Sequence, residues 1–372
     1  MSSTIKKQLQ EVERLLIHGD FQEGLALIEK NLKKKAISKE EKLGFLVLKS
    51  TILNDLGKHK EALETAEEAL NEGGEIDNIL LHVDALFQKG HAAYFVYEDM
   101  NEFITCIDKG LELLDTTKLA IPEKELAKRK ALLLNYKGQY FLMSGNIKEC
   151  LKIVEESIPF ARKSEDKRIL TICLIWAAYF TRKINYIEEA YEIASEIGNK
   201  MLLALSYVPL SGIEARKYNY NEAIELYEKA FPLLEEVGST YLRELLYNNL
   251  GLYYQANYQL DKALECFQRA LKGSRVQSYI MLGNIGYNYY LMYELEEARK
   301  YYLQSMKKCE ELKDYRILPN SLYQLINISL EFGENDQAQN YLNRLKQISE
   351  EAGTEYVSHV AHFATVLLLK AS

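Results

Sequence analysis

LYNNLGLYYQANYQLDKALECFQRAL, from Leu246 to Leu271, contains the clearest two-helix pattern in the chain. In its first half, apolar or small residues recur at the i, i+3, i+4 and i+7 positions, which form one face of an α-helix; they are Tyr247, Leu250, Gly251 and Tyr254. Asn257 breaks this pattern, and a second stripe follows at Ala263, Phe267, Ala270 and Leu271. We therefore predict two antiparallel helices joined by a short turn. The small residues Gly251 and Ala263 mark the places where the two helices approach most closely.

The same unit recurs along the chain. In each copy one residue, small in every copy but one, opens the second helix, and we call these residues the anchor residues. Successive anchor residues are separated by 33 to 47 residues; they are Gly24, Ala62, Phe103, Cys150, Ala190, Ala223, Ala263, Ala298 and Ala338. Self-similarity at such a period is typical of a helical solenoid, in which each repeat packs on its neighbours.

The unit resembles the tetratricopeptide repeat (TPR). An aromatic residue, Leu-Gly and a tyrosine occur in the first helix, and an alanine, an aromatic residue and a second alanine occur in the second helix. The resemblance covers nearly the whole chain and is strongest from Ala204 to Lys346. Several repeats are longer than the common length, which resembles kinesin light chains and the spindle-orientation adaptors. The proline that usually ends each repeat is missing.

We predict an all-α fold, a right-handed α-solenoid (superhelix) of about nine TPR-like helix hairpins that forms a single domain over residues 1–372. The repeats are weak over residues 1–130 and clear over residues 131–350. Residues 354–370 are predicted to form a C-terminal capping helix, because a solenoid needs a cover on its last repeat for solubility. Since the chain stops directly after this helix, a fragment of a longer protein is an alternative.

Composition and charge argue against several classes of partner. The chain has 46 Lys and Arg against 54 Asp and Glu, a formal net charge of −8. Nucleic acids and anionic membranes attract basic proteins, so neither is an expected partner. No apolar run resembles a signal peptide or reaches the ~20 residues that span a bilayer. The five cysteines are widely spaced without a CxxC pair, as in a reduced, cytoplasmic protein.

No motif for catalysis or for cofactor binding is recognisable. The sequence lacks GxGxxG and GxxxxGK[ST] phosphate loops, an HExxH zinc motif and a nucleophile signature. Glu355, His359 and His362 lie at helical spacing, which metal binding can use, but two partly exposed histidines on a capping helix are the favoured explanation because no other ligand is identifiable. We predict no metal site, no cofactor and no enzymatic activity. The other histidines are predicted to be turn or surface residues; they are His18, His59, His82 and His91.

In TPR proteins the first helices line a concave groove that holds a peptide. This resemblance directs attention to the first-helix residues that point away from the core stripe; they are Asn248, Asn249, Gln255, Asn284, Tyr287, Tyr290, Tyr323, Gln324 and Asn327. Asn249, Asn284 and Gln324 occupy matching places in three consecutive repeats, and their amides can pair with a peptide main chain while the tyrosines line side-chain pockets. Alternatively, these amides bond only the neighbouring helix.

A second candidate site lies in the middle of the chain. Trp176, Tyr179, Arg182 and Lys183 follow each other at helical spacing, and Arg216 holds the matching place of Lys183 in the next repeat. An aromatic side chain beside basic groups suits an acidic, aromatic or phosphorylated peptide. A buried tryptophan with solvated charges is the alternative.

The predicted function is that of a protein-interaction scaffold, which binds a peptide or a partner protein along one continuous inner surface. The alternative is a peptide-responsive regulatory or sensor arm of a larger signalling protein. No DNA-binding or phosphatase-type helical bundle is recognisable before the first repeat, which favours the scaffold.

Overall fold

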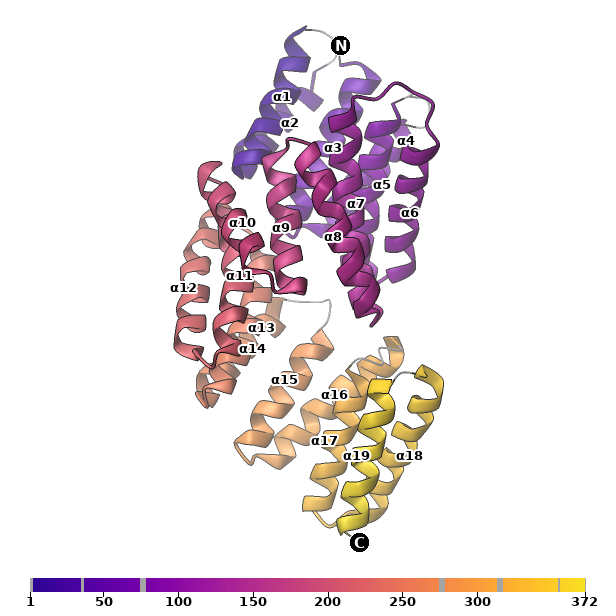
Figure 1. The fold of residues 1–372 in the computed structure, drawn as a ribbon, viewed down its shortest axis with the longest axis vertical. Helices are drawn as coiled ribbons and strands as arrows, with labels where there is room; N and C mark the ends of the chain where they lie inside the picture. The colour runs from indigo at the N-terminus through magenta and orange to yellow at the C-terminus, as the bar shows by residue number, and fades with distance from the viewer. Residues whose placement is uncertain are drawn as a thin grey trace. The chain divides into compact units, whose positions relative to one another are not determined.

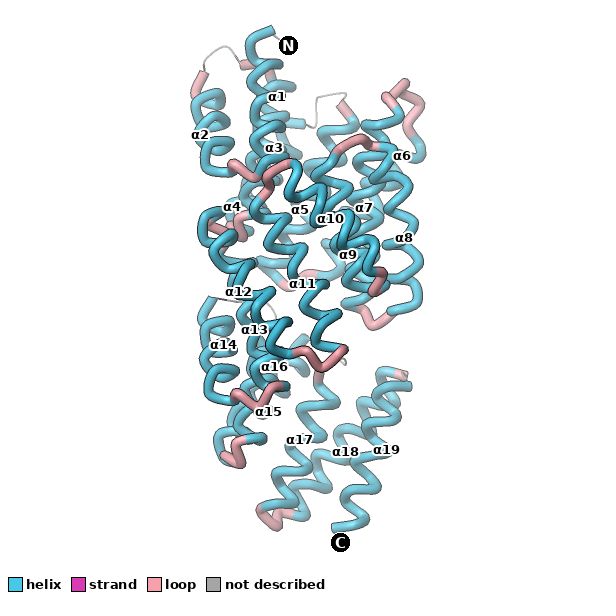
Figure 2. The backbone as a smooth tube through the Cα atoms, turned by 60° about the vertical axis from the view of Figure 1, so that its left-hand side comes forward, coloured by secondary structure: helices cyan, strands magenta, loops and turns pink. Residues whose placement is uncertain are grey.

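The structure, a computed structural model, describes residues 3–34, 37–73, 78–273, 278–312, 317–353 and 355–371. Throughout these residues, the regular elements are α-helices, nineteen in all (Figure 2). This confirms the predicted all-α class built from consecutive helix hairpins. The contacts of the chain divide it into two compact units, unit 1 over Met1–Arg243 and unit 2 over Glu244–Ser372. We describe each unit by itself.

Unit 1 contains six hairpins and the first residues of a seventh (Figure 1). Odd-numbered helices are the first helices of the hairpins, and even-numbered helices are the second. The helices are α1 (Ser3–His18), α2 (Phe21–Leu32), α3 (Lys39–Asp55), α4 (His59–Gly73), α5 (Ile79–Tyr97), α6 (Met100–Thr116), α7 (Glu123–Met143), α8 (Ile147–Lys163), α9 (Lys167–Thr181), α10 (Ile184–Glu196), α11 (Lys200–Arg216) and α12 (Tyr220–Val237).

Unit 2 contains the remaining hairpins and a last single helix. Its helices are α13 (Thr240–Ala256), of which the first four residues belong to unit 1, α14 (Leu260–Gly273), α15 (Ser278–Leu291), α16 (Leu295–Leu312), α17 (Leu318–Glu331), α18 (Asn335–Ala352) and α19 (Glu355–Ala371). Helix α19 lies against α17 and α18, as predicted for the capping helix. Its residues Val357, Ala361 and Ala364 are buried in the same cluster as Leu322 and Leu342.

The anchor residues explain why the hairpins close. All nine are buried, as expected for residues at the contact between two helices. Gly251 shows how little space is left there, because a Cβ atom at this position would lie 2.5 Å from the Cε1 atom of Phe267. The prediction of a close approach at Gly251 and Ala263 is therefore confirmed.

The turn inside each hairpin follows a common rule. In eight of the nine repeats, the residue five positions before the anchor residue has a positive φ. Glycine occupies this position in four repeats, and tyrosine occupies it in three consecutive repeats, at Tyr218, Tyr258 and Tyr293. The next residue then bonds back to the first helix, as where the Gln259 N–H donates to the Tyr254 carbonyl at 2.8 Å. This bond satisfies a carbonyl at the helix end.

In unit 1, the end of α1 also touches the turn between α10 and α11. The side-chain amide of Asn199, before α11, donates to the carbonyl of Ile17 in α1 at 2.8 Å. His18 Nδ1 donates to the carbonyl of Ile197 at 2.6 Å. These contacts join residues about 180 positions apart, so unit 1 closes on itself instead of relying on nearest-neighbour packing alone.

A second set of contacts joins the end of α3 to the starts of α9 and α13. Arg168 forms an ion pair with Asp55 at 2.5 Å, and Ser239 Oγ donates to the Asp55 carbonyl at 3.1 Å. Tyr241 packs against Gly57 so closely that a Cβ on this glycine would lie 2.3 Å from the tyrosine Cβ. The sequence analysis predicted packing between successive repeats and did not predict these contacts between distant ones.

Candidate functional site

Three tyrosines of the first helices of unit 2 and one of the turn after α15 lie near one another, and we call them the tyrosine cluster; they are Tyr287, Tyr290, Tyr323 and Tyr293. The rings of Tyr287 and Tyr290 lie 6.4 Å apart with nearly parallel planes. Tyr287 is 40% exposed and Tyr293 is 72% exposed. Burial raises the pKa of Tyr290, and the charge of Glu331 at the end of α17 acts in the same direction. Tyr293, in the turn after α15, donates its hydroxyl to Glu331 Oε2 at 3.3 Å.

The predicted amide ladder begins on α13 and α15. The Asn284 side-chain amide donates to Asn248 Oδ1 at 2.9 Å, and Asn248 Nδ2 in turn donates to Asn249 Oδ1 at 3.5 Å. Asn249 and Asn284 both keep part of their surface accessible. Each amide has two N–H donors and an oxygen with two lone pairs. These contacts therefore do not use all the hydrogen bonds that the amides can form.

Two of the proposed groove residues are buried instead. Asn248 and Gln255 are each only 8% exposed, so the expectation that they point toward a ligand is wrong. Gln255 Nε2 donates to the Asn284 carbonyl at 3.4 Å and to Asn288 Oδ1 at 3.3 Å, and Asn288 donates to the Leu260 carbonyl at 2.9 Å. These amides form hydrogen bonds between neighbouring helices, as buried polar groups usually do with the protein around them.

The third residue of the predicted ladder, Gln324, lies on α17, one turn from Asn327. Asn327 Nδ2 donates to Gln324 Oε1 at 3.3 Å, and both residues are partly exposed. Tyr356 of α19, which the sequence did not single out, reaches the same region and donates its hydroxyl to Asn320 Oδ1 at 2.8 Å. The capping helix therefore adds an aromatic residue, 45% exposed, to this surface.

The mid-chain candidate is an aromatic group on α9. Trp176 contacts Tyr179 with a centroid distance of 6.0 Å and stacks on Phe180 at 5.7 Å. Tyr179 is 46% exposed; burial raises its pKa, and the positive charge of Arg216 opposes the rise. The structure therefore places Arg216 near the aromatic residues, and it adds Phe180, which the sequence analysis missed.

The two other basic residues of this candidate do not continue the helix. Helix α9 ends at Thr181, and Arg182 caps it with a φ of 63°, so Lys183 already lies at the start of α10. Lys183 pairs with Glu155 of α8 and lies over the ring of Tyr186. The assumed helical spacing was wrong here, because the turn after α9 consists of these two residues alone.

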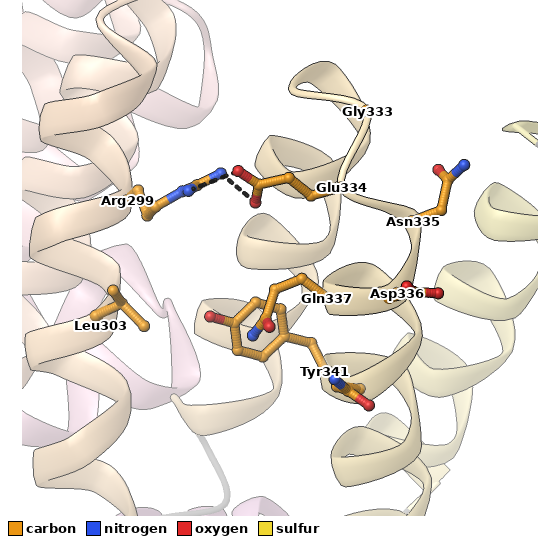
Figure 3. Close-up of a pocket in the computed structure, with 9 residues that line it drawn as sticks. Arg299, Leu303, Gly333, Glu334, Asn335, Asp336, Gln337 and Tyr341 are labelled. Carbon is orange, nitrogen blue, oxygen red and sulfur yellow. Dashed lines mark hydrogen bonds and ion pairs between the residues drawn. The ribbon is translucent and has the colours of Figure 1, made fainter.

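A third feature is an open depression of about 750 Å³ between the second helices α16 and α18, which the sequence did not predict (Figure 3). Its wall includes Arg299, whose guanidinium is held by both oxygens of Glu334 at 2.8 and 3.1 Å and lies over the Phe332 ring. This arginine is already neutralised, so we assign no ligand to the depression.

The interior of unit 1 contains two histidines that the sequence placed in turns or at the surface. His59 stacks on Phe95 at 4.1 Å, and His91 lies 5.1 Å from the rings of both Phe95 and Tyr136. Burial lowers the pKa of His59 to about 4 and that of His91 to about 3, so both rings are neutral at pH 7. The prediction of a turn or surface residue is wrong for His91, whereas His59 is the first residue of α4, directly after the predicted turn.

The remaining ionisable candidates lie on α19. His359 Nε2 is 3.9 Å from Glu355 Oε1, and both side chains are largely exposed. No cluster of three or more potential metal ligands is found among the residues that the structure describes. Within the same residues, no helix combines the length and the apolar character needed to cross a lipid bilayer.

Comparison with family models finds three matches. A model described as tetratricopeptide repeat matches residues 202–276, and a second one of the same description matches residues 281–312. A model of anaphase-promoting complex subunit 5 matches residues 126–186. No functionally curated protein matches the sequence.

Several solved structures share the fold. A Rap protein complexed with competence and sporulation factor aligns with a TM-score of 0.63 and 16% identity over 95% of this chain and 99% of that one. A signal transduction ATPase from Pyrococcus horikoshii with a tetratricopeptide repeat sensor aligns with a TM-score of 0.60 and 15% identity. The alignment covers 91% of this chain and 50% of that one. NprR in complex with its cognate peptide NprX aligns with a TM-score of 0.55 and 12% identity over 86% of this chain and 98% of that one.

Proposed function

Since the chain is a tetratricopeptide-repeat protein, we propose that it is a non-enzymatic interaction protein that binds a peptide, or a peptide segment of a partner protein, on the first-helix surface of unit 2. The observation that carries the proposal is the tyrosine cluster beside amides that keep bonding capacity. The residues proposed to contact the peptide are Asn249, Asn284, Tyr287, Tyr290, Tyr323, Gln324 and Asn327.

A bound peptide needs two kinds of contact. Its main chain offers N–H and C=O groups that must find partners, and an amide side chain can serve either. Its side chains need apolar surface, and tyrosine supplies large area at low entropic cost because it has only two rotatable bonds. An exposed ring such as that of Tyr287 contributes little to the core, so its burial becomes favourable only when a partner covers it.

Two structural neighbours support a peptide as the partner. The Rap protein is complexed with competence and sporulation factor, and NprR is in complex with its cognate peptide NprX. The aromatic residues of α9 in unit 1, with Arg216, are proposed as a further contact region for an acidic or aromatic segment. The five cysteines are all buried thiols without disulfides, which suits a reducing compartment such as the cytoplasm.

A sensor role is the second candidate function. It is supported by the closed contacts of unit 1 at Asp55, Arg168 and Tyr241, because a ligand that favours an open form would have to break them. One neighbour carries its repeats as a sensor. A sensor requires that ligand binding change the radius of gyration of the protein in small-angle scattering, whereas a rigid scaffold requires no such change.

Removing the tyrosine cluster is expected to weaken peptide binding. A peptide is first selected from a displayed random library on the immobilised full chain, and its Kd is measured by fluorescence polarisation. The double variant Tyr287→Ala and Tyr290→Ala should raise this Kd at least about tenfold, since central aromatic residues dominate such interfaces. Asn249→Ala combined with Asn284→Ala should raise it by a similar factor.

The matched control is Gln304→Ala, an exposed position on the second helix α16. It should leave the Kd unchanged, and all variants should keep their helical circular dichroism. Equal binding by the tyrosine double variant and the unaltered protein would remove the proposed surface.

A further inference from the structure

Glu331 stands out among the carboxylates of unit 2. It is the last residue of α17, it is exposed, and its oxygen accepts the hydroxyl of Tyr293 from the neighbouring repeat. Within the described parts of the chain, no lysine or arginine forms an ion pair with it. The acidic group is therefore held beside aromatic rings without a basic partner.

Three other acidic residues of unit 2 pair with basic side chains. Glu334 is paired with Arg299, Glu310 with Arg344, and Glu297 with Lys300. The arrangement at Glu331 differs, because the groups placed beside its carboxylate are Tyr293 and Tyr290 of the preceding repeat. A negative charge beside these two aromatic rings is complementary to a cation that carries a flat, weakly hydrated surface.

We propose that the tyrosine cluster and Glu331 form a pocket for an arginine side chain of the bound peptide. The inference rests on the proposed function, since it names the chemistry of one residue in the ligand. The guanidinium would stack on the faces of Tyr287 and Tyr290 and donate hydrogen bonds to the Glu331 carboxylate.

The shape of the site favours arginine over lysine. A guanidinium is planar, so it can lie along the nearly parallel rings of Tyr287 and Tyr290, and its fork of N–H donors matches the two carboxylate oxygens. A lysine ammonium is a strongly hydrated point charge and would satisfy only one of these contacts well. A neutral side chain would leave the carboxylate unpaired beneath the peptide, at a cost in desolvation.

The test uses a displayed random heptapeptide library and synthetic peptides as probes. Peptides that bind the full chain should be enriched in arginine at one position. In the best binder, replacing this arginine with citrulline, which keeps the shape but loses the charge, should raise the Kd about tenfold or more; lysine should give a smaller rise. Glu331→Gln should bring the arginine and citrulline peptides to similar Kd values, whereas Glu350→Gln, an exposed carboxylate on α18, should preserve the difference.

The outcomes separate this inference from the proposed function. If selected peptides bind, lose affinity in the Tyr287→Ala and Tyr290→Ala variant, and show no preference for arginine, the arginine pocket is wrong while the peptide-binding surface stands. A preference for arginine that survives in Glu331→Gln also overturns the pocket. If no peptide binds the full chain, both proposals fail.

Discussion

Replacing Arg168 with leucine is expected to destabilise unit 1 by about 3–5 kcal/mol, the range for removing one partner of a buried ion pair. The Arg168 side chain is 8% exposed and that of Asp55 is 19% exposed. Without the guanidinium, the carboxylate at the end of α3 would stay in the interior with no opposite charge. Burial already raises the pKa of Asp55 despite the arginine, which shows how poorly this environment accommodates a negative charge.

The measurement can be confined to unit 1. The chain has one tryptophan, Trp176, and it lies in α9 of this unit, so its fluorescence in a urea titration follows the unfolding of unit 1. The control is Arg162→Leu, which removes a bidentate pair with Glu189 that is largely exposed. Surface pairs contribute about 1 kcal/mol or less, so this variant should lose little. If Arg168→Leu lost as little unfolding free energy as this control, the Asp55–Arg168 pair would not stabilise the closed form of unit 1.

Acidification from pH 7 to pH 5 is expected to cost unit 1 about 4 kcal/mol, about 2 kcal/mol from each of His59 and His91. Burial holds their pKa values at about 4 and about 3 in the folded chain. In the unfolded chain they titrate near the ordinary value, about 6.5. Below this value the unfolded state binds protons that the folded state refuses, so stability falls with pH until the folded-state pKa values are reached.

Two carboxyl groups act against this loss. Burial raises the pKa of Asp55 and of Glu13, so both take up protons more readily in the folded chain. The His91→Phe variant isolates one histidine, because phenylalanine fits the ring cluster with Phe95 and Tyr136 but does not titrate. Its stability should fall by about 2 kcal/mol less than that of the unaltered chain between pH 7 and pH 5. An identical fall in both proteins would show that His91 is accessible to protons in the folded state.

Local periodicity was sufficient to predict the hairpins. A residue such as Ala263 must be small wherever two helices touch, and this requirement recurs with each repeat, so all nine anchor residues could be found from the sequence. The degenerate copy at Phe103 was found because the spacing between its neighbours left room for one more hairpin. The same reasoning predicted the capping helix through the stripe that includes Val357 and Ala361.

The closure of unit 1 could not be predicted in this way. Asp55 and Arg168 are 113 positions apart, and their contact depends on the curvature of several stacked hairpins, which no local pattern specifies. His91 lies among Phe87 and Phe95 of its own helix and Tyr136 of α7, and its spacing in the sequence does not specify this position. Asn248 was misassigned for a different reason, because an amide on a first helix can bond a ligand or the next helix, and its spacing is the same in both cases.

Photocrosslinking tests the central claim most directly. A benzophenone amino acid is placed at Tyr323 on the first-helix surface of unit 2, or at Gln304 on the second helix α16, and the selected peptide is added. The account predicts that the peptide is captured from position 323 and that an excess of unlabelled peptide prevents this capture, with little capture from position 304. Capture from position 304 without capture from position 323 would contradict the claim that the first helices of unit 2 hold the peptide.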